Sequence, residues 1–386
     1  MTNRLDAESP RTLTRGAFWT SAAFYALVAL EFLYMGSPFA AYFYSVYGPS
    51  LDFLGGSAIA SWLVSFFMPH IVAQTTSSVL DSHTIVGFIL ALVGIVGFGL
   101  GAWQIYSAKL RKRETVESGL YRWIRHPQYL GLIVASFGLL LIWPRFLVLF
   151  GFVTVVFLYV LLARSEERLC ARRFQAYAGY AERTGMFLPR IVEAPFRRVR
   201  LPSSRLVRAL AWLVLYVIAL ALAAAAGLAV QSYSIASLYA HYTNTAAYVS
   251  VGRMAPSEIA ELAAIANKDA RVGGAIQRAE KDGTARFLNY VLPTEMFVSE
   301  IPQHLPPGAK TGHRVPRNHD RNSYKIVFTL VRPRPGSIPN GPAIVRDAVN
   351  KTAVIEAWID RAEARVVRTF PPPEKPRFGG NPVPVF

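Results

Sequence analysis

Five stretches of the chain are dominated by Ala, Leu, Val, Ile, Phe and Gly, and they place a membrane domain in its first 230 residues. They cover residues 17–35, 56–73, 84–106, 130–163 and 207–230. About 20 consecutive apolar residues suffice to cross the roughly 30 Å hydrocarbon core of a bilayer. The first stretch is long and lacks a following small-residue cleavage site, so a removable signal peptide is not expected. The pattern predicts an integral membrane protein with several helical spans.

Two of these stretches need a closer interpretation. The stretch 130–163 is too long for one span, and Trp143-Pro144-Arg145 interrupts it. Because proline ends or kinks a helix, we expect two short, tilted helices joined by a tight turn. The stretch 56–73 contains Pro69 and His70. If the N-terminus and residues 107–128 lie on the same side of the membrane, the chain crosses it an even number of times before residue 107. Three apolar stretches precede that residue, so one of them must be half-buried or re-entrant, and 56–73 is the candidate.

Basic residues indicate which segments share a face of the membrane. No Lys or Arg occurs between Arg15 and Lys109, after which residues 107–128 and 164–208 are rich in both. The positive-inside rule therefore places both segments in the cytoplasm, where they can build one site. The net charge of +17 is then explained by orientation and by anionic lipid head groups, and no nucleic-acid partner is expected.

The last part of the chain, residues 240–386, is more polar. Pro256–Ala266 is expected to form a helix and Tyr324–Val331 a strand, and Ala353–Ile359 and Glu363–Phe370 are expected to pair as a hairpin. The predicted fold class is an all-α multi-span membrane domain followed by a small soluble α+β domain. The predicted division is a cytoplasmic segment (1–16), a membrane domain (17–205), an additional transmembrane helix (206–232), a soluble α+β domain (233–370) and a disordered Pro-rich tail (371–386).

The segment GLYRWIRHPQYLG, residues 119–131, concentrates groups that a simple linker does not need. Arg125 offers a planar fork of donors for a carboxylate. His126 can donate or accept a hydrogen bond near neutral pH, and Tyr121 and Tyr129 present stacking faces with polar tips. Pro127 fixes the turn before the next helix. The alternative is an anchor at the membrane surface, with Arg125 among head groups.

A second segment, RSEERLCARRFQAYAGY at residues 164–180, leaves the membrane as one helix. Glu166, Cys170, Arg173 and Tyr177 recur at spacings that put them on one face. Carboxylates this close to hydrocarbon are costly unless compensated. The alternative is that Glu166 and its neighbour pair with nearby arginines on a solvated face. Cys170 is the only cysteine, so an intrachain disulfide is impossible and a small helix residue is the simpler interpretation.

Taken together, the two segments resemble the isoprenylcysteine carboxyl methyltransferase family, which includes phospholipid and small-thiol methyltransferases. The resemblance covers roughly residues 84–190 and leaves residues 240–386 without a counterpart. The matching pattern is Ser118-Gly119-Leu120-Tyr121, Arg125-His126-Pro127-x-Tyr129-x-Gly131, a helical hairpin, Glu166-Glu167, and the late aromatics Tyr177 and Tyr180.

The resemblance implies a site for S-adenosyl-L-methionine. The implied cofactor-binding residues are Gln104, Arg113, Glu114, Thr115, Val116, Tyr121, His126, Pro127, Gln128, Tyr129 and Glu166. The implied catalytic residues are Arg125, Arg164 and Glu167. Leu162 stands where the family usually has an arginine that holds the substrate, and the usual glycine before the late tyrosines is missing. The identity of the substrate therefore stays open.

The leading hypothesis is a methyltransferase of the bacterial inner membrane that acts on a hydrophobic or membrane-associated acceptor. Its partners would be the bilayer, the acceptor and an unknown partner of the C-terminal domain, with the cofactor site in the cytoplasm and that domain outside. Two alternatives are a small-thiol methyltransferase of the same fold and a non-catalytic membrane scaffold or sensor with a degenerate cofactor pocket.

Two further patterns have simpler interpretations. Gly94, Gly97, Gly99 and Gly101 lie inside an apolar stretch, so close helix packing is favoured over a nucleotide loop. The residues His304, His313, His319 and Asp320 could ligate a metal, but their spacings match no tight pattern, and no metal is predicted.

Overall fold

The computed structural model divides the chain into two compact units, and each is described by itself. The described residues are 15–16, 18–23, 25–26, 40–111, 116–193, 204–280, 283–305, 308–376, 378 and 382–386. The helical unit comprises the described residues between 15 and 26, together with His83–Trp143 and Val148–Ala225 as far as these are described. The sheet unit comprises Leu33–Ser82, Pro144–Leu147 and Ala226–Phe386. The predicted segment 1–16 and the apolar stretch 17–35 lie largely outside the described residues.

Among the described residues, three helices are long and apolar enough to cross a membrane. They are α3 (Ser78–Leu110), α5 (Phe146–Arg173) and α8 (Arg205–Ala236), and each contains a long run of apolar residues. The helix α4 (Pro127–Ile142) is apolar but has 16 residues, about 24 Å at 1.5 Å per residue. These findings support a membrane protein and confirm the predicted apolar helices at 84–106, 130–163 and 207–230.

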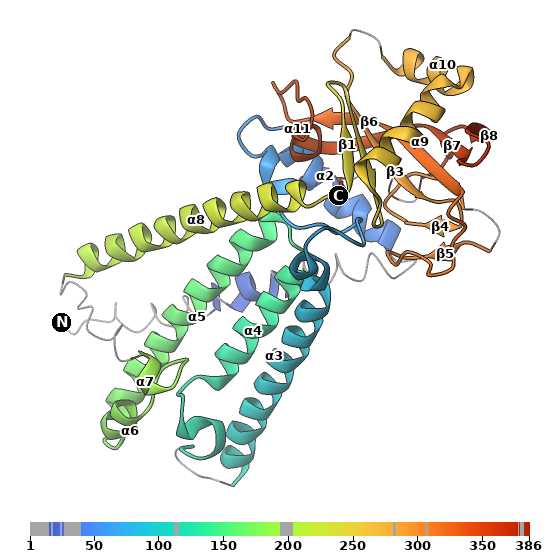
Figure 1. Ribbon diagram of the computed structural model, residues 1–386. Coiled ribbons are helices and arrows are strands. Elements are labelled where there is room, and N and C mark those ends of the chain that lie inside the picture. Colours follow the sequence, from blue (N-terminus) through green and yellow to red (C-terminus); the bar gives the residue numbers. More distant parts are fainter. Residues whose placement is uncertain are drawn as a thin grey trace. The chain divides into compact units, whose positions relative to one another are not determined.

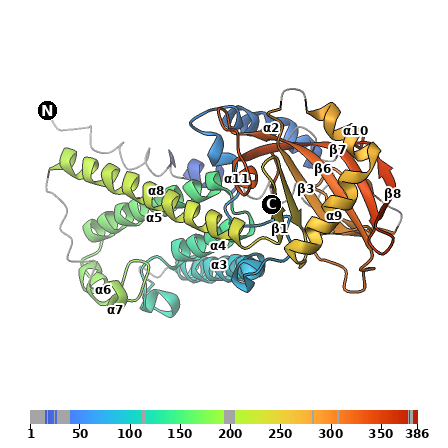
Figure 2. The ribbon, with the colours of Figure 1, turned by 45° about the horizontal axis from the view of Figure 1, so that its top comes forward.

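The helices α3 and α4 run antiparallel and pack through glycines (Figures 1 and 2). A Cβ added to Gly94 would lie 2.3 Å from the backbone nitrogen of Ala135, and one added to Gly138 would lie 2.4 Å from that of Ala91. Such distances leave no room for a side chain, so the two backbones touch. Gly97 itself is looser, with its nearest contact 4.0 Å away. Of the four glycines expected to serve helix packing, Gly94 and Gly101 make close contacts, whereas Gly99 has nothing within 4 Å of an added Cβ.

The predicted break after α4 is present. The helix ends at Ile142 and α5 begins at Phe146, with Pro144 between them. Three short helical elements complete the described part of the helical unit around the two polar segments. They are η3 (Gly119–Arg122), α6 (Tyr177–Arg183) and α7 (Arg190–Glu193).

The sheet unit is built on a six-stranded mixed sheet in the order β1-β2-β3-β6-β7-β8. Its strands are β1 (Ala240–Tyr242), β2 (Ala246–Ser250), β3 (Phe287–Pro293), β6 (Ser323–Pro333), β7 (Ala348–Asp360) and β8 (Arg365–Phe370). Only β2 and β3 run parallel; the other neighbours are antiparallel. A separate parallel pair joins β4 (Met296–Phe297) and β5 (Lys310–Thr311). The predicted strand and hairpin are confirmed.

Both faces of this sheet are covered, as alternate residues of β2 show. Ala246 and Tyr248 belong to one buried cluster, which includes apolar residues of α9 (Pro256–Lys268) and α10 (Ala270–Ala279). Ala247 and Val249 belong to the other, with α11 (Ala343–Asp347) and residues 71–72. Burial on both faces explains why β2 and β3 lack a polar alternation. The predicted helix 256–266 is confirmed as α9.

The stretch 56–73 is not a membrane helix, and its predicted place as a half-buried or re-entrant segment is not what the structure shows. After α2 (Ala40–Gly55) and η2 (Ser61–Val64), it continues without regular structure into the core of the sheet unit. Its carbonyl groups are satisfied there: Gln231 Nε2 donates to the Phe66 carbonyl at 2.8 Å, and Ser234 Oγ to that of Phe67 at 3.0 Å. The sequence-based domain 17–205 thus spans parts of both units.

The prediction of a disordered tail is wrong for its last five residues. Residues 382–386 are buried in the sheet unit. Tyr290 Oη donates to the Val385 carbonyl at 2.6 Å, and the backbone N–H of His70 donates to the Phe386 oxygen at 2.8 Å. The prolines suggested disorder, but the Val and Phe side chains between them are apolar enough to complete a core.

Candidate functional site

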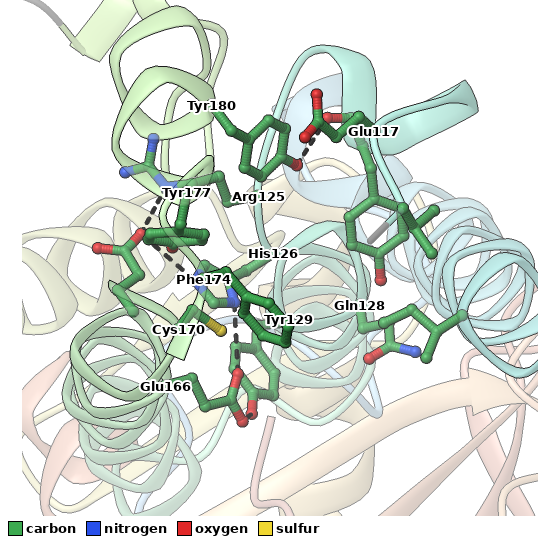
Figure 3. A pocket seen from close by; sticks show the side chains of 14 residues that line it. Glu117, Arg125, His126, Gln128, Tyr129, Glu166, Cys170, Phe174, Tyr177 and Tyr180 are labelled. Atoms are coloured by element: carbon green, nitrogen blue, oxygen red, sulfur yellow. Dashed lines mark hydrogen bonds and ion pairs between the residues drawn. The ribbon is translucent and has the colours of Figure 1, made fainter. Parts of the chain in front are cut away.

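A cavity of about 370 Å³ lies in the helical unit where the two polar segments meet (Figure 3). Its walls come from the end of α3, the residues from 116 to 129, the end of α5 and the start of α6. The lining residues are Ile105, Val116, Glu117, Tyr121, Arg125, His126, Gln128, Tyr129, Glu166, Glu167, Cys170, Phe174, Tyr177 and Tyr180. Its size falls in the range of pockets that bind small molecules and cofactors.

Gly119 fixes the start of the first segment against α3. Its φ of +62° lies in the left-handed region that glycine tolerates best. The side chain of Gln104 fills the space beside it, since an added Cβ would fall 1.9 Å from Gln104 Nε2. Gln104 Oε1 accepts a hydrogen bond from the backbone of Leu120 at 3.2 Å. Gln104, expected to bind the cofactor, therefore supports this turn and is not among the residues that line the cavity.

The backbones of the two segments are joined directly. The N–H of Arg125 donates to the Gly185 carbonyl at 2.8 Å, and that of His126 donates to the Met186 carbonyl at 3.0 Å. The Glu193 carboxylate in turn accepts the N–H of Met186 at 2.7 Å. Pro127 then opens α4 at its first position, where its missing N–H costs nothing. The sequence prediction that the two segments meet is confirmed.

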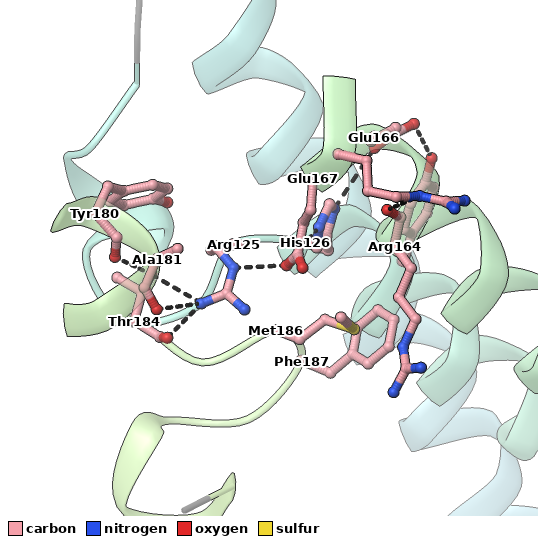
Figure 4. Close-up of polar contacts among 12 residues, drawn as sticks. Arg125, His126, Arg164, Glu166, Glu167, Tyr180, Ala181, Thr184, Met186 and Phe187 are labelled. Atoms are coloured by element: carbon pink, nitrogen blue, oxygen red, sulfur yellow. Dashed lines mark hydrogen bonds and ion pairs between the residues drawn. The ribbon is translucent and has the colours of Figure 1, made fainter. Parts of the chain in front are cut away.

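Arg125 lies at the centre of this junction (Figure 4). Its Nε donates to Glu167 Oε1 at 2.6 Å, and its Nη1 donates to the carbonyl of Ala181 at 3.0 Å and to that of Thr184. The side chains of Arg125 and Glu167 are only 7% and 20% exposed. All three oxygens are protein partners of one guanidinium, so its main role in this arrangement is to position Glu167 and the segment after α6.

His126, Tyr129 and Glu166 converge in the cavity (Figure 3). Tyr129 Oη donates to Glu166 Oε1 at 2.5 Å, and His126 Nδ1 lies 3.6 Å from Glu166 Oε2. The rings of His126 and Tyr129 stack with centroids 5.5 Å apart, and Tyr129 stacks on Tyr159 at 5.2 Å. The Glu166 side chain is 45% exposed, so its carboxylate remains accessible from the cavity.

The cavity carries more acidic than basic groups and several phenols. Three carboxylates, from Glu117, Glu166 and Glu167, line it beside one guanidinium and one imidazole. Burial raises the pKa of Tyr180 to about 12, although the Arg125 charge lowers it. Burial also raises the pKa of Tyr121, with the nearby Tyr180 and Glu166 adding to the effect. These phenols therefore stay neutral near pH 7, and Tyr180 Oη donates to the Tyr121 carbonyl at 2.8 Å.

Most of the predicted site residues meet in this cavity. The lining includes Val116, Tyr121, Arg125, His126, Gln128, Tyr129, Glu166 and Glu167. Pro127 faces α3 near Gly101 instead, and Arg113, Glu114 and Thr115 lie outside the described residues. Arg164, expected to be catalytic, is not among the lining residues. Its guanidinium lies 4.6 Å over the Trp212 ring, and Figure 4 shows it pointing away from Arg125.

Sequence reasoning missed three lining residues and one anchor. Ile105 and Glu117 flank the first segment, and Phe174 follows Cys170 by one helical turn. That spacing was a usable signal for Phe174, because residues four apart share a helix face. Glu193 lies far outside the motif region and gave no such signal. The interpretation of the two glutamates as partners of neighbouring arginines is not what the structure shows, since Glu167 pairs with Arg125.

Comparisons with known proteins give one match. Residues 49–184 match a family model described as a protein of unknown function, DUF1295. The match covers the described part of the cavity walls up to Tyr180 and ends before Glu193. No curated protein and no solved structure matches the chain.

Proposed function

We propose that the chain is an integral membrane methyltransferase that uses S-adenosyl-L-methionine. The observation that supports this best is the convergence of His126, Tyr129, Glu166 and the Arg125–Glu167 pair in one cavity of suitable size. The same residue types, in the same order, make up the pattern by which the sequence resembles the isoprenylcysteine carboxyl methyltransferase family.

The donor set of the cavity fits the cofactor. When bound, S-adenosyl-L-methionine would supply a methyl group on a sulfonium: a nucleophile forms a bond to the methyl carbon, the carbon–sulfur bond breaks, and the neutral thioether leaves. Its amino acid end needs a carboxylate for the ammonium and donors for the carboxylate. Glu166 offers the first, and the Gln128 amide and the phenols offer the second. The acidic groups and aromatic faces suit a positively charged ligand.

The residues of the chain would hold and orient the cofactor and exclude water from the site. Glu166 would exchange its hydrogen bond from Tyr129 for one from the ligand's ammonium, while the stacked rings keep His126 and Tyr129 in place. The buried Arg125–Glu167 pair keeps this wall rigid. Alignment of the reacting atoms in a site closed to water is the main source of rate for such a displacement.

The acceptor is proposed to be hydrophobic or membrane-associated, because apolar helices that can span a membrane form the unit that holds the cavity. Arg164 packs on Trp212, and Leu162 replaces the usual arginine. This helix face therefore has no counterpart of the arginine that holds the substrate in the family that the sequence resembles. A small thiol is the alternative acceptor. Location in a bacterial inner membrane, with the cavity on the cytoplasmic side, belongs to the same proposal.

Calorimetric titration of S-adenosyl-L-methionine into the detergent-purified full chain tests the proposal. Saturable binding is expected, with at least a tenfold loss of affinity in Glu166→Gln and His126→Ala. Glu182→Gln, an exposed glutamate on α6 outside the cavity lining, is the matched control and should bind as the wild type does. If the wild type shows no binding, the scaffold or sensor alternative replaces the enzyme.

A second measurement identifies the acceptor. The wild type is incubated with cofactor carrying a labelled methyl group, together with either a membrane lipid extract or a set of small thiols. Label in the lipid extract supports the hydrophobic acceptor, whereas label in the thiol set alone supports the thiol branch. Binding without transfer to either would overturn the proposed acceptor classes while leaving the cofactor site intact.

A further inference from the structure

Two histidines and a glutamate from distant parts of the chain meet in the sheet unit. His70 comes from the irregular segment after η2, Glu300 from the turn after β4, and His313 from the segment after β5. One potential ligand atom from each lies within 4.8 Å of those of the other two. His313 Nε2 is 3.1 Å and His70 Nε2 is 3.9 Å from the same oxygen, Glu300 Oε1.

The Glu300 carboxylate is deeply buried, and only one of its two oxygens is hydrogen-bonded among the described residues. The Glu300 side chain is 1% exposed, and among the described residues its Oε2 has no hydrogen-bond partner. A buried carboxylate oxygen without a partner is costly in a native fold. The His313 side chain is 33% exposed. It therefore forms the side of the cluster that solvent reaches.

We propose that His70, Glu300 and His313 bind a divalent transition-metal ion, with Zn²⁺ as the best fit. Two imidazoles and one carboxylate are a ligand set that zinc uses where a fourth position stays open to water or substrate. Tetrahedral coordination at about 2.0–2.1 Å brings ligand atoms to roughly 3.3 Å from one another. Small side-chain rotations would close the present separations. If Glu300 bound the ion through both carboxylate oxygens, the ion would also satisfy its unpartnered Oε2.

The protein around the cluster supports this arrangement. The backbone of His70 is fixed, since its N–H donates to the Phe386 oxygen at 2.8 Å. The imidazole of His70 lies 5.1 Å from that of His313, nearly edge to face. Lys351 is the cationic side chain whose charge acts on Glu300, but its Nζ is turned to the Pro384 carbonyl at 2.8 Å. The Glu300 carboxylate instead interacts with the two histidines and with its own backbone N–H.

The simpler alternative is a buried ion pair between Glu300 and a protonated His313. It accounts for one carboxylate oxygen and one imidazole. It does not account for the approach of the second imidazole to the same oxygen or for the unpartnered Oε2. The cluster lies wholly in the sheet unit, whereas the methyl-transfer cavity lies in the helical unit. The metal proposal therefore stands or falls independently of the proposed function.

The test uses the full chain purified in detergent with a tag that contains no histidine. The protein is stripped with a chelator, equilibrated with Zn²⁺, and analysed for bound metal by mass spectrometry. One zinc per chain is expected for the wild type, with at least a tenfold loss of affinity in His313→Ala and Glu300→Gln. His304→Ala and His319→Ala remove histidines of the same unit outside the cluster and should retain one zinc per chain.

Two readouts separate loss of the site from loss of the fold. Co²⁺ in the stripped wild type should give the strong visible absorption of a four-coordinate site, and His313→Ala should lose it. Zn²⁺ should raise the unfolding temperature of the wild type above that of its own metal-free form, and it should not raise that of His313→Ala above that of its own metal-free form. The proposal is overturned if the wild type binds no zinc, or if His313→Ala binds as tightly as His304→Ala.

Discussion

Replacing Arg125 with methionine tests whether the Arg125–Glu167 pair holds the cavity wall together. The change removes the 2.6 Å ion pair and the bonds to the carbonyls of Ala181 and Thr184, while it keeps most of the side-chain volume. Removing one partner of a buried pair typically costs about 3–5 kcal/mol. Because Glu167 keeps His126 at 3.4 Å and is 20% exposed, we expect a smaller cost, about 2–4 kcal/mol.

Hydrogen exchange by mass spectrometry measures this local cost. The informative amides belong to Arg125 and His126, which are bonded to the carbonyls of Gly185 and Met186. A cost of about 2–4 kcal/mol corresponds to roughly 30- to 700-fold faster exchange in peptides that cover the two segments. Glu167→Gln and the double variant complete a cycle that isolates the energy of the pair itself.

The chain offers a matched control for this experiment. Arg183 and Glu117 form an ion pair at 3.3 Å, but their side chains are 69% and 38% exposed. Such exposed pairs contribute about 0–1 kcal/mol, so Arg183→Met should change exchange by less than about fivefold. If Arg125→Met accelerates exchange no more than Arg183→Met does, the reasoning that Arg125 positions the cavity wall is refuted.

Three further perturbations have clear expected outcomes. Gly119→Ala forces a Cβ against Gln104 at a left-handed φ, so the free energy of unfolding should fall by about 1–3 kcal/mol. Thermal unfolding should show this loss, and titration should show weaker cofactor binding. Gly179→Ala is the control and should be tolerated, because nothing lies within 4 Å of the added Cβ. The pKa of Tyr180 is raised by burial from 10.0 to about 12, so its contribution to stability is complete below pH 10 and lost as pH rises to about 12; Tyr180→Phe should lack this loss in unfolding measured against pH. Burial lowers the pKa of Lys325 from 10.5 to about 8, so the unfolded chain binds more protons between these pH values. The wild type should therefore gain stability from pH 8 to 10.5, whereas Lys325→Met should not. Equal slopes of the free energy of unfolding against pH for the two proteins would contradict this expectation.

The sequence predicted the helical unit and its cavity well, because the relevant signals are local. Apolar length identifies α3, α5 and α8, and Pro144 marks the break between α4 and α5. The polar and aromatic side chains that line the cavity are concentrated in two short segments with a recognisable order. The direction in which a side chain points was harder to predict. Arg164 occurs three residues before Glu167, yet its side chain packs on Trp212 instead of joining the Arg125–Glu167 pair.

The two misassigned apolar segments, 56–73 and the end of the tail, share one physical cause. Apolar composition does not distinguish a segment that faces lipid from one that faces a protein core. Residues 64–72 and 382–386 are therefore apolar for a reason that only the folded sheet unit reveals. The cluster of His70, Glu300 and His313 was not predicted from the sequence for a related reason: tertiary structure brings His70 and His313 together, and their spacing along the chain does not indicate this. The α+β elements were predicted where alternation or helical period was strong, as in α9 and β6.

The discontinuous make-up of the sheet unit constrains how the protein can be synthesised and how it can have evolved. The ribosome releases residues 40–82 long before strands β1 to β8 exist, so this apolar early segment must be kept from aggregating, by a chaperone or by the insertion machinery, until its partners emerge. For the same reason, the C-terminal half is not a cassette that recombination could exchange by itself. A gene fragment encoding it alone would yield a polypeptide lacking Ile71 and Val72 from its own interior.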